Sequence, residues 1–397
     1  MRIAIVSTKP ASLNSGGEVR IYYLREGLKK KFSVDFFMPQ ITTSFDFLTR
    51  LKNLLSGKIP YFEHVKTATL TNEQIVQIRN ADLIQVAELE SFYAIEKYLK
   101  DLNKPVALDA HNIEYKKFLS GTETEGFFIK WLGRFLATKV KRLEIEALAK
   151  MNYILACSEE EREYFTQYKS ADNICCIPNG VKKSKLNTTL NKSKNILFMG
   201  LLSYGPNADG IRYYLEEIHP LVKKMDKEIT ITIIGRNPPN WLQEKAKTDN
   251  TILVKGFVDS VDMELQKAAV CICPIRYGSG TRLKVLEYMA AGKPVVSTTI
   301  GAEGITAVAD KEIIIADDPT IFAKKIIELM NSKEKATQIG LSANVESAVV
   351  LAQKEVIMEE LNVKDLKILT DVGQFVTRVA IPNAKILGPK YGKAVQE

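Results

Sequence analysis

Short runs of aliphatic and β-branched residues recur along most of the chain, and polar segments with helical spacing separate them. Runs that are apolar throughout, rather than alternating, are typical of strands buried on both faces, as in a parallel sheet. The strands predicted in this way are 3–7, 34–38, 81–86, 105–108, 153–158, 174–177, 195–200, 228–235, 252–254, 270–275, 295–298 and 313–316. Strands that alternate with helices in this way predict an α/β fold.

The most informative stretch runs from 276 to 299 (RYGSGTRLKVLEYMAAGKPVVSTT). It begins with a loop that contains Gly278 and Gly280, and residues 281–291 then have the spacing of a short helix. Gly292 and Pro294 end that helix, since glycine is favoured just past a helix and proline cannot continue one. Backbone N–H groups of a glycine loop at a helix N-terminus favour a bound anion.

Charged residues at the start of this helix also point to an anion. Arg282 and Lys284 fall in the predicted first turn, where cations oppose the helix dipole. A bound phosphate or diphosphate would resolve that conflict. Glu287, further along, could accept two ribose hydroxyls, as acidic residues do in other nucleotide sites. The alternative is a helix with solvated charges after an ordinary loop.

Residues Gly278 to Thr298 resemble the nucleotide-sugar signature of family 4 glycosyltransferases, which have the GT-B fold of two facing Rossmann-like domains. The resemblance implies that Glu287 binds the ribose of the donor. The family usually carries an earlier glutamate for the donor sugar, at the position that Ser279 occupies here. Backbone amides of Gly278, Ser279 and Gly280 are expected to replace that contact, with Thr281 completing the donor loop.

In the first half of the chain, Gly16 and Gly17 end the loop after the first strand. They are either a flexible connection or, as the resemblance implies, the floor of the donor site. His111, Asn112 and Glu114 follow the strand 105–108, and ligands of α/β folds bind just past the carboxyl ends of strands. The resemblance implies that His111 faces the donor sugar and the acceptor, with Asn112 and Glu114 on the acceptor side. A structural histidine is the alternative.

In the second half, many family members carry an arginine and a lysine that hold the diphosphate, soon after a glycine equivalent to Gly200. Here residues 201–207 (LLSYGPN) contain neither. Arg282 and Lys284 are therefore the main candidates for neutralising the diphosphate and its developing charge. The other donor-site candidates are Arg236 at the end of a strand and, near the nucleobase, Gly256 and Val258, for which an ordinary strand end is the alternative.

The predicted boundaries are an N-terminal acceptor-side domain at 1–177, a linker at 178–194, a nucleotide-sugar-binding domain at 195–341 and a small α+β tail at 342–397. The linker begins with Pro-Asn-Gly, which is strong turn chemistry. The tail contains Leu-Gly-Pro-Lys-Tyr-Gly-Lys and resembles a fragment of the C-terminal region of isoleucyl-tRNA synthetase. We interpret it as a fused fragment, with a degenerate native ending as the alternative.

Residues 45–62 and 127–142 mix aromatic and basic side chains at helical spacing. Each is either a core-facing helix with a solvated face or a segment that lies on an anionic membrane. The net charge of +8 suits anionic partners but is too diffuse to indicate nucleic acid. No apolar run is long enough to span a bilayer and the first strand starts at once, so a cytoplasmic protein is expected, at the inner face of the membrane if these segments bind lipid.

The residue types argue against a metal site or another cofactor. The five cysteines follow no metal-ligand spacing, only three histidines are present, and no Asp-x-Asp pair occurs. We therefore predict a metal-independent, retaining glycosyltransferase that moves a sugar from a nucleotide-diphosphate sugar to a glycan or lipid-linked acceptor, as in cell-envelope or exopolysaccharide synthesis. A sugar-nucleotide epimerase and a non-catalytic nucleotide-sugar-binding protein are the alternatives.

Overall fold

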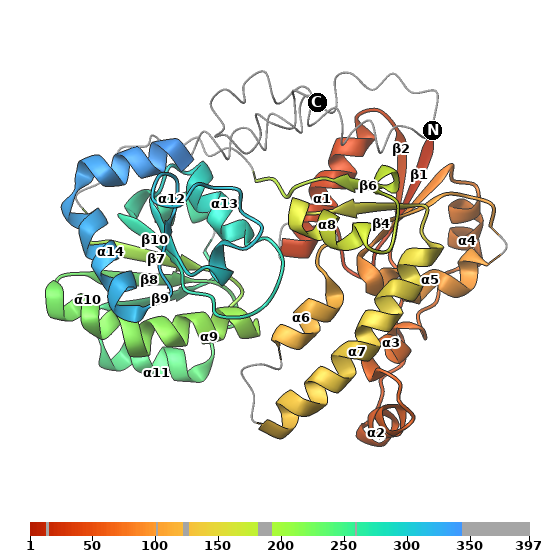
Figure 1. Cartoon of the computed structure of the whole chain (residues 1–397), viewed down its shortest axis with the longest axis horizontal. Coiled ribbons are helices and arrows are strands. Elements are labelled where there is room, and N and C mark those ends of the chain that lie inside the picture. The colour runs from red at the N-terminus through yellow and green to blue at the C-terminus, as the bar shows by residue number, and fades with distance from the viewer. Residues whose placement is uncertain (13–15, 101, 122–126, 182–192, 259, 344–397) are drawn as a thin grey trace. The chain divides into compact units, whose positions relative to one another are not determined.

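The computed structural model describes residues 1–343, except 13–15, 101, 122–126, 182–192 and 259 (Figure 1). The predicted tail at 342–397 therefore lies almost wholly outside the described residues, as does most of the predicted linker. The described residues form two compact units, the first within Met1–Pro178 and the second within residues 179–343.

The first unit is built on a sheet of six parallel strands in the order β2-β1-β3-β4-β5-β6. Alternate residues of each strand enter two apolar cores on opposite faces, as Ala4 and Val6 do on one face and Ile3 and Ile5 on the other. The strands are β1 Arg2–Val6, β2 Ser33–Phe37, β3 Leu83–Ala87, β4 Val106–Asp109, β5 Tyr153–Ala156 and β6 Ile174–Cys176.

Helices surround this sheet (Figure 1). They are α1 Gly16–Lys29, α2 Phe47–Leu55, α3 Pro60–Val65, α4 Asn72–Arg79, α5 Glu88–Leu99, α6 Glu114–Ser120, α7 Phe127–Lys150 and α8 Glu159–Thr166, with a 3₁₀ turn η1 at Ala171–Asn173. Two sequence predictions need correction here. Gly16 and Gly17 belong to α1 rather than to the preceding loop, and the stretch 45–62 is two helices, because Pro60 starts a new one.

The second unit has the same plan, with six parallel strands in the order β12-β11-β10-β7-β8-β9. The strands are β7 Asn195–Met199, β8 Thr230–Ile234, β9 Ile252–Gly256, β10 Val270–Cys273, β11 Val295–Ser297 and β12 Ile314–Ile315. The helices are α9 Gly205–Tyr213, η2 Tyr214–Ile218, α10 His219–Met225, α11 Asn240–Thr248, α12 Val261–Lys267, α13 Leu283–Ala290, η3 Ile300–Ala302 and α14 Pro319–Asn331.

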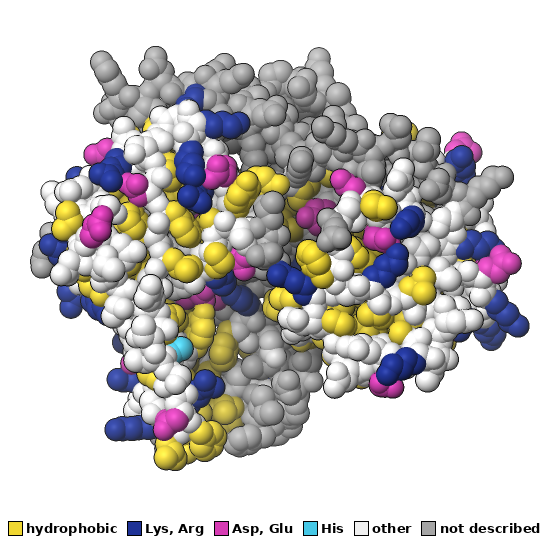
Figure 2. Space-filling view, turned by 180° about the vertical axis from the view of Figure 1, so that it is seen from behind, with side chains coloured by type: hydrophobic (Ala, Val, Ile, Leu, Met, Phe, Trp, Pro, Cys, Tyr) yellow, Lys and Arg dark blue, Asp and Glu magenta, His cyan; other side chains and the backbone are white. Residues whose placement is uncertain are grey.

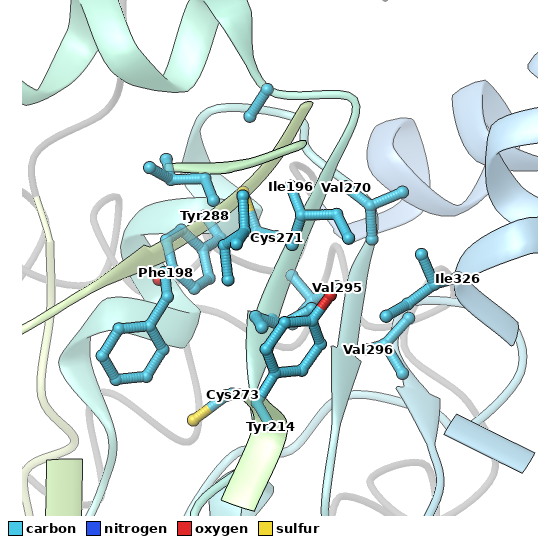
Figure 3. Packing of buried hydrophobic residues seen from close by; sticks show 14 of the residues in the cluster. Ile196, Phe198, Tyr214, Val270, Cys271, Cys273, Tyr288, Val295, Val296 and Ile326 are labelled. Atoms are coloured by element: carbon cyan, nitrogen blue, oxygen red, sulfur yellow. The ribbon is translucent and has the colours of Figure 1, made fainter. Parts of the chain in front are cut away.

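One large apolar core supports the central strands of this unit. Figure 3 shows side chains of β10 and β11 packed with Tyr214, Tyr288 and Ile326, all of them fully or almost fully buried. The hydroxyl of Tyr288, on α13, accepts a hydrogen bond from the backbone N–H of Met199, at the end of β7 (2.8 Å). Packing and this hydrogen bond together fix α13 against the carboxyl ends of the strands, which is where its charged first turn is needed.

Helix α13 begins at Leu283, two residues later than the spacing predicted. Arg282 is extended rather than helical, and its guanidinium Nη1 donates back to the carbonyl of Ser279 (2.7 Å) and to that of Gly280. Arg282 therefore occupies the N-cap position without capping the helix through its side chain, and of the two cations Lys284 lies in the first turn.

Candidate functional site

The glycine loop of the second unit connects β10 to α13 and needs its glycines. Gly278 and Gly280 have φ values of 102° and 86°, which residues with a side chain rarely adopt. A Cβ on Gly278 would lie 3.1 Å from Cγ of Pro206, in the first turn of α9. The loop therefore packs directly against the start of a second helix.

Two helix N-termini meet at this loop, and neither is capped by a side chain. The N-cap residues are Tyr204 for α9 and Arg282 for α13, and neither makes a side-chain capping hydrogen bond. An uncapped helix leaves backbone N–H donors in its first turn and carries a partial positive charge there. This arrangement suits an anion with several acceptor oxygens, such as a diphosphate.

The ammonium of Lys284 adds a full positive charge between these helices. Its Nζ donates to Oδ1 of Asn207 on α9 (2.6 Å) and lies 4.4 Å from the ring centroid of Phe198. Among the described residues, no carboxylate lies within ion-pair distance of it. Burial lowers the pKa of Lys284 to about 8, only partly opposed by Cys273 and Glu287. A buried cation without a counter-charge is costly, and an anionic ligand would supply one.

Several buried polar atoms of the loop lack a hydrogen-bond partner in the part of the chain that the structure describes. They are Nε and Nη2 of Arg282 and the hydroxyl oxygens of Ser279 and Thr281. The carboxylate of Glu303 lies 3.6 Å from Nη2 of Arg282, within ion-pair range only. Because buried polar groups are rarely left unpaired, these atoms mark a place where a polar ligand would complete the structure.

Three strand ends are tied together beside this loop. The N–H of Gly235 donates to the carbonyl of Gly256 (2.7 Å), and a Cβ on Gly235 would come within 1.7 Å of the carbonyl oxygen of Gly200. Arg236 follows directly, and its carbonyl accepts from the N–H of Leu202 (3.0 Å). The structure thus brings the predicted residues Arg236 and Gly256 to the same edge of the sheet as Lys284, at the ends of adjacent strands.

Glu287 and Val258 also belong to this unit. Glu287 lies one turn beyond Lys284 on α13. Burial raises the pKa of Glu287 to about 7, with Lys284 opposing the rise and Asp262 adding to it. Val258 is partly buried and packs against the apolar core, so it offers a ligand mainly its backbone.

The first unit has a different site, a chain of buried charges at the carboxyl ends of β3 and β4. Arg20 on α1 donates from Nε (2.9 Å) and Nη2 (2.7 Å) to Oδ1 of Asp109, the last residue of β4. The other oxygen of Asp109 lies 3.0 Å from Nε2 of His111, and Nδ1 of His111 lies 3.2 Å from Oε1 of Glu88. Lys9 pairs in turn with Glu88.

These neighbours determine the protonation of His111. Burial alone would lower the pKa of His111, but Asp109 and Glu88 outweigh it and raise the value to about 9. Burial likewise opposes ionisation of Glu88, yet His111 and Lys9 hold its pKa well below the usual range. These two carboxylates thus favour the protonated imidazole at neutral pH.

The remaining predicted residues of this unit lie close by. A Cβ on Gly17 would lie 3.3 Å from Nδ1 of His111, so a side chain at this position would crowd the imidazole. Gly16 starts the same helix. Glu114 starts α6, and its carboxylate pairs with Lys117 (3.2 Å). Asn112, between His111 and α6, is half-buried.

Sequence reasoning missed Glu88, Asp109, Arg20 and Lys9 in the first unit and Asn207 in the second. Glu88 and Asp109 stand at the carboxyl ends of β3 and β4, and the rule that selected His111 would have found them. The remaining residues carry no local signal, because only the fold brings them to their partners.

Comparison with known proteins places both units among glycosyltransferases. Residues 14–185 match the family model described as "Glycosyltransferase Family 4", and residues 193–332 match that described as "Glycosyl transferases group 1". A Klebsiella pneumoniae protein described as "Uncharacterized 44.6 kDa protein in cps region" is 33% identical over 157 residues. That match covers 38% of this chain and 40% of the Klebsiella protein, so it reaches less than half of either.

Solved structures share the fold. Sucrose-phosphate synthase from Thermosynechococcus elongatus superposes with a TM-score of 0.66 at 14% identity, covering 94% of this chain and 98% of that one. HepE from Anabaena, solved with UDP-glucose, has a TM-score of 0.55 at 14% identity and 91% and 100% coverage. TarM has a TM-score of 0.54 at 18% identity, and the match covers 70% of this chain but only 55% of TarM.

These similarities confirm the predicted α/β fold of GT-B type, with two Rossmann-like units. Within the described residues, no helix is both long enough and apolar enough to pass through a bilayer.

Proposed function

The chain carries both domains of a GT-B glycosyltransferase, and from that premise we propose that it transfers a sugar, with retention, from a nucleotide-diphosphate sugar to a glycan or lipid-linked acceptor. One observation carries the proposal. Two uncapped helix N-termini, the buried ammonium of Lys284 and unpartnered donors of Arg282, Ser279 and Thr281 converge on one glycine loop. A diphosphate is the ligand that would satisfy all of them together.

In this proposal, the second unit binds the donor. Lys284 and Arg282 take the diphosphate, and each charge-assisted contact would contribute roughly 1.5–3 kcal/mol. Glu287 accepts the ribose hydroxyls, while Arg236, Gly256 and Val258 complete the nucleotide site. Because cations aimed at the leaving diphosphate stabilise the charge that develops there, Lys284 and Arg282 do the work that a metal ion does in other transferases.

The first unit supplies the acceptor side. His111 presents a protonated imidazole near neutral pH, which suits hydrogen bonding to hydroxyl groups of the donor sugar or the acceptor. Gly16 and Gly17 form the turn of α1 beside it, and Asn112 and Glu114 line the acceptor side.

Similar proteins indicate which ligands to test first. HepE was solved with UDP-glucose and TarM with UDP, and the Klebsiella relative is described as lying in a cps region. We therefore propose a uridine-diphosphate donor and a role in capsular or related polysaccharide synthesis.

The first test is calorimetry with a panel of UDP, GDP, ADP, CMP and NAD on the wild type and on Glu287→Ala. We expect one nucleoside diphosphate to bind and the substitution to weaken it. Failure of all of them to bind would reject the donor site. Abolished transfer with unchanged donor binding in Glu287→Ala would contradict the ribose role.

Turnover assays then separate the transferase from its rivals. We expect sugar transfer to an acceptor with the anomeric configuration of the donor retained. We also expect chelators to leave the rate of transfer unchanged. Donor turnover without any acceptor would indicate the epimerase. Binding without turnover would indicate a nucleotide-sugar-binding protein.

We also propose that the first unit touches an anionic membrane, at the cytoplasmic face. Phe47 of α2 and Trp131 of α7 are 76% and 60% exposed, and Leu48 and Phe135 are exposed beside them on the same helices. Figure 2 shows hydrophobic side chains next to Lys and Arg at the end of the molecule that α2 occupies. Exposed aromatics among basic residues suit the interface of an anionic bilayer.

Liposome flotation tests this contact. Vesicles with anionic lipid should carry the wild type up the gradient, and a Phe47→Ser/Trp131→Ser variant should stay behind. Ile321→Ser, which alters a half-exposed residue of the second unit, is the matched control. A wild type that ignores these vesicles would reject the membrane role.

A further inference from the structure

Glu88 has an unusual backbone conformation for its residue type. It stands at the junction of β3 and α5, and its φ is +65°. Among the described residues, the other non-glycine positions with positive φ are Asn237 and Asp310, whose short side chains tolerate this region. Glutamate has no such advantage. A strained conformation persists only where the surrounding structure imposes it, and such residues cluster at functional sites.

In this conformation the carboxylate of Glu88 is buried, with its side chain 4% exposed. Oε1 lies 3.2 Å from Nδ1 of His111, and Oε2 bonds with Nζ of Lys9. A Cβ on Gly17 would lie only 3.4 Å from the same Oε1, so the first turn of α1 closes over the carboxylate. Folding therefore places a charge in the interior at a strained residue, although the surface is the usual place for glutamate.

We propose that Glu88 is a positioning residue of the acceptor-side site: together with Asp109, it holds the imidazole of His111 doubly protonated and fixed in orientation. The inference rests on the proposed function for the role of His111, but its structural part stands independently. Its consequence is chemical. His111 acts as a cation and hydrogen-bond donor, and the base that takes the acceptor proton is another group.

The surrounding charges support this assignment because they alternate in sign. Arg20 faces Asp109, Asp109 faces His111, His111 faces Glu88, and Glu88 faces Lys9. Further out, Lys9 also lies 3.3 Å from Glu90. Lys117, which pairs with Glu114 on α6, also acts on Glu88 and Lys9. A neutral imidazole would break this alternation and leave the two carboxylates facing an uncharged ring.

Each ring nitrogen of His111 lies beside one of the two carboxylates. Nε2 lies 3.0 Å from Asp109 and is hydrogen-bonded. Nδ1 is close enough to Glu88 for an ion pair, but it is out of line for a hydrogen bond with any described residue. The Nδ1–H group is therefore buried beside the carboxylate of Glu88, which favours its protonated form through charge at short range.

Nuclear magnetic resonance of the full chain, with labelled histidine, tests the proposal directly. The protein contains only three histidines, so the His111 signal can be assigned by its loss in His111→Asn. We expect His111 to titrate near pH 9 in the wild type. Removal of one adjacent carboxylate in Glu88→Gln should lower that pKa by roughly 1–3 units.

Matched variants separate the effect of the Glu88 carboxylate on the pKa of His111 from the effect of the backbone strain on stability. Glu88→Gly removes both, because glycine adopts positive φ without cost, so the relieved strain should offset part of the stability lost with the ion pairs, and the lowered pKa should remain. Glu88→Asp should recover part of the shift. Glu96→Gln, on the same helix but paired with Lys150, should leave His111 unchanged.

If transfer activity is found, the alkaline limb of its pH profile should move to lower pH in Glu88→Gln by the same amount as the titration. If no transfer is found, the titration still decides the structural part, so the two proposals fail separately. A wild-type His111 that titrates near 6.5 overturns the inference. So does a pKa that neither Glu88→Gln nor Glu88→Gly moves.

Discussion

The two units place charged groups at the same ends of their strands but balance them differently. In the first unit, Arg20, Asp109, His111 and Glu88 neutralise one another within the protein. In the second, the ammonium of Lys284 has only the amide of Asn207 as a hydrogen-bond partner in the part of the chain that the structure describes. In the first site the charges are balanced within the protein, whereas in the second an anionic ligand would supply the missing counter-charge.

The difference has a thermodynamic consequence. A buried pair stabilises the fold only while both partners remain, since the loss of one leaves the other charge unpaired. A buried lone cation reduces stability until an anion binds. Substitutions of cations in the two units should therefore have opposite effects on stability.

The largest effect is expected for Arg20→Met. Removal of this cation leaves the fully buried carboxylate of Asp109 with His111 alone, which should cost the first unit about 3–5 kcal/mol of stability. Hydrogen exchange read on peptides of β4 would measure it, because a protein of two units need not unfold in one step. The control is Arg142→Met, whose exposed pair with Glu146 should be worth less than about 1 kcal/mol. Equal losses in both variants would refute the prediction.

The next effect is a dependence of the first unit on pH. The pKa of His111 is raised from 6.5 to about 9, so its stabilisation is complete below pH 6.5 and disappears as the pH rises through 9. This rise in pKa corresponds to a loss on the order of 3 kcal/mol in the free energy of unfolding of the first unit. Hydrogen exchange of β3 and β4, corrected for its intrinsic pH dependence, should show this slope, and His111→Asn should abolish it. If the stability of the wild type depended on pH as little as that of His111→Asn, the pairing of His111 with the two carboxylates would be contradicted.

Lys284→Met should change stability in the direction opposite to Arg20→Met. The folded-state pKa of Lys284 lies near 8, below the ordinary 10.5, so this lysine destabilises the second unit below pH 8, and the loss is recovered as the pH rises toward 10.5. The substitution should raise the stability of the second unit at pH 7 by about 1–2 kcal/mol, once the cost of losing the hydrogen bond to Asn207 is subtracted. At the same time it should weaken donor binding by roughly 10–150-fold, the equivalent of one charge-assisted contact.

Exchange on peptides of α13 and calorimetry with UDP-glucose would measure these two effects. Asn207→Leu is the matched control, because it removes the same hydrogen bond but keeps the cation. It should reduce affinity less than Lys284→Met does. A destabilised Lys284→Met with unchanged affinity would show that Lys284 is a structural residue.

The smallest effect is expected for the pH dependence of donor binding. With a pKa of about 7, Glu287 becomes protonated below that pH, and affinity for UDP-glucose should fall at most about tenfold per pH unit. Above pH 8, deprotonation of Lys284 should weaken binding again. A sugar diphosphate is the better probe here, since both of its phosphates are diesters that do not titrate in this range. Glu287→Gln should remove the acidic limb, and an acidic limb that survives it would show that another group is responsible.

Much of the site could be predicted from local sequence. The loop of Gly278 and Gly280 needs positive φ, and the helix after it ends at Ala290, just before Gly292, so both follow from residue type and spacing. The same holds for the position of His111 past the end of a buried strand. One local error, the predicted start of α13, arose because the guanidinium of Arg282 bonds back to its own loop, a competition that periodicity does not show.

By itself, the sequence determined the strands, their parallel character and the segments that could hold a phosphate, because these depend on the hydrophobic pattern and on backbone freedom of neighbouring residues. Only the tertiary structure decided which charges are balanced. Arg20 and Asp109 are far apart in the chain, as are Lys284 and Asn207, and each pair meets only after the sheets form. A pKa depends on burial and on charges a few ångströms away, so the protonation of His111 and Lys284 is a property of the fold.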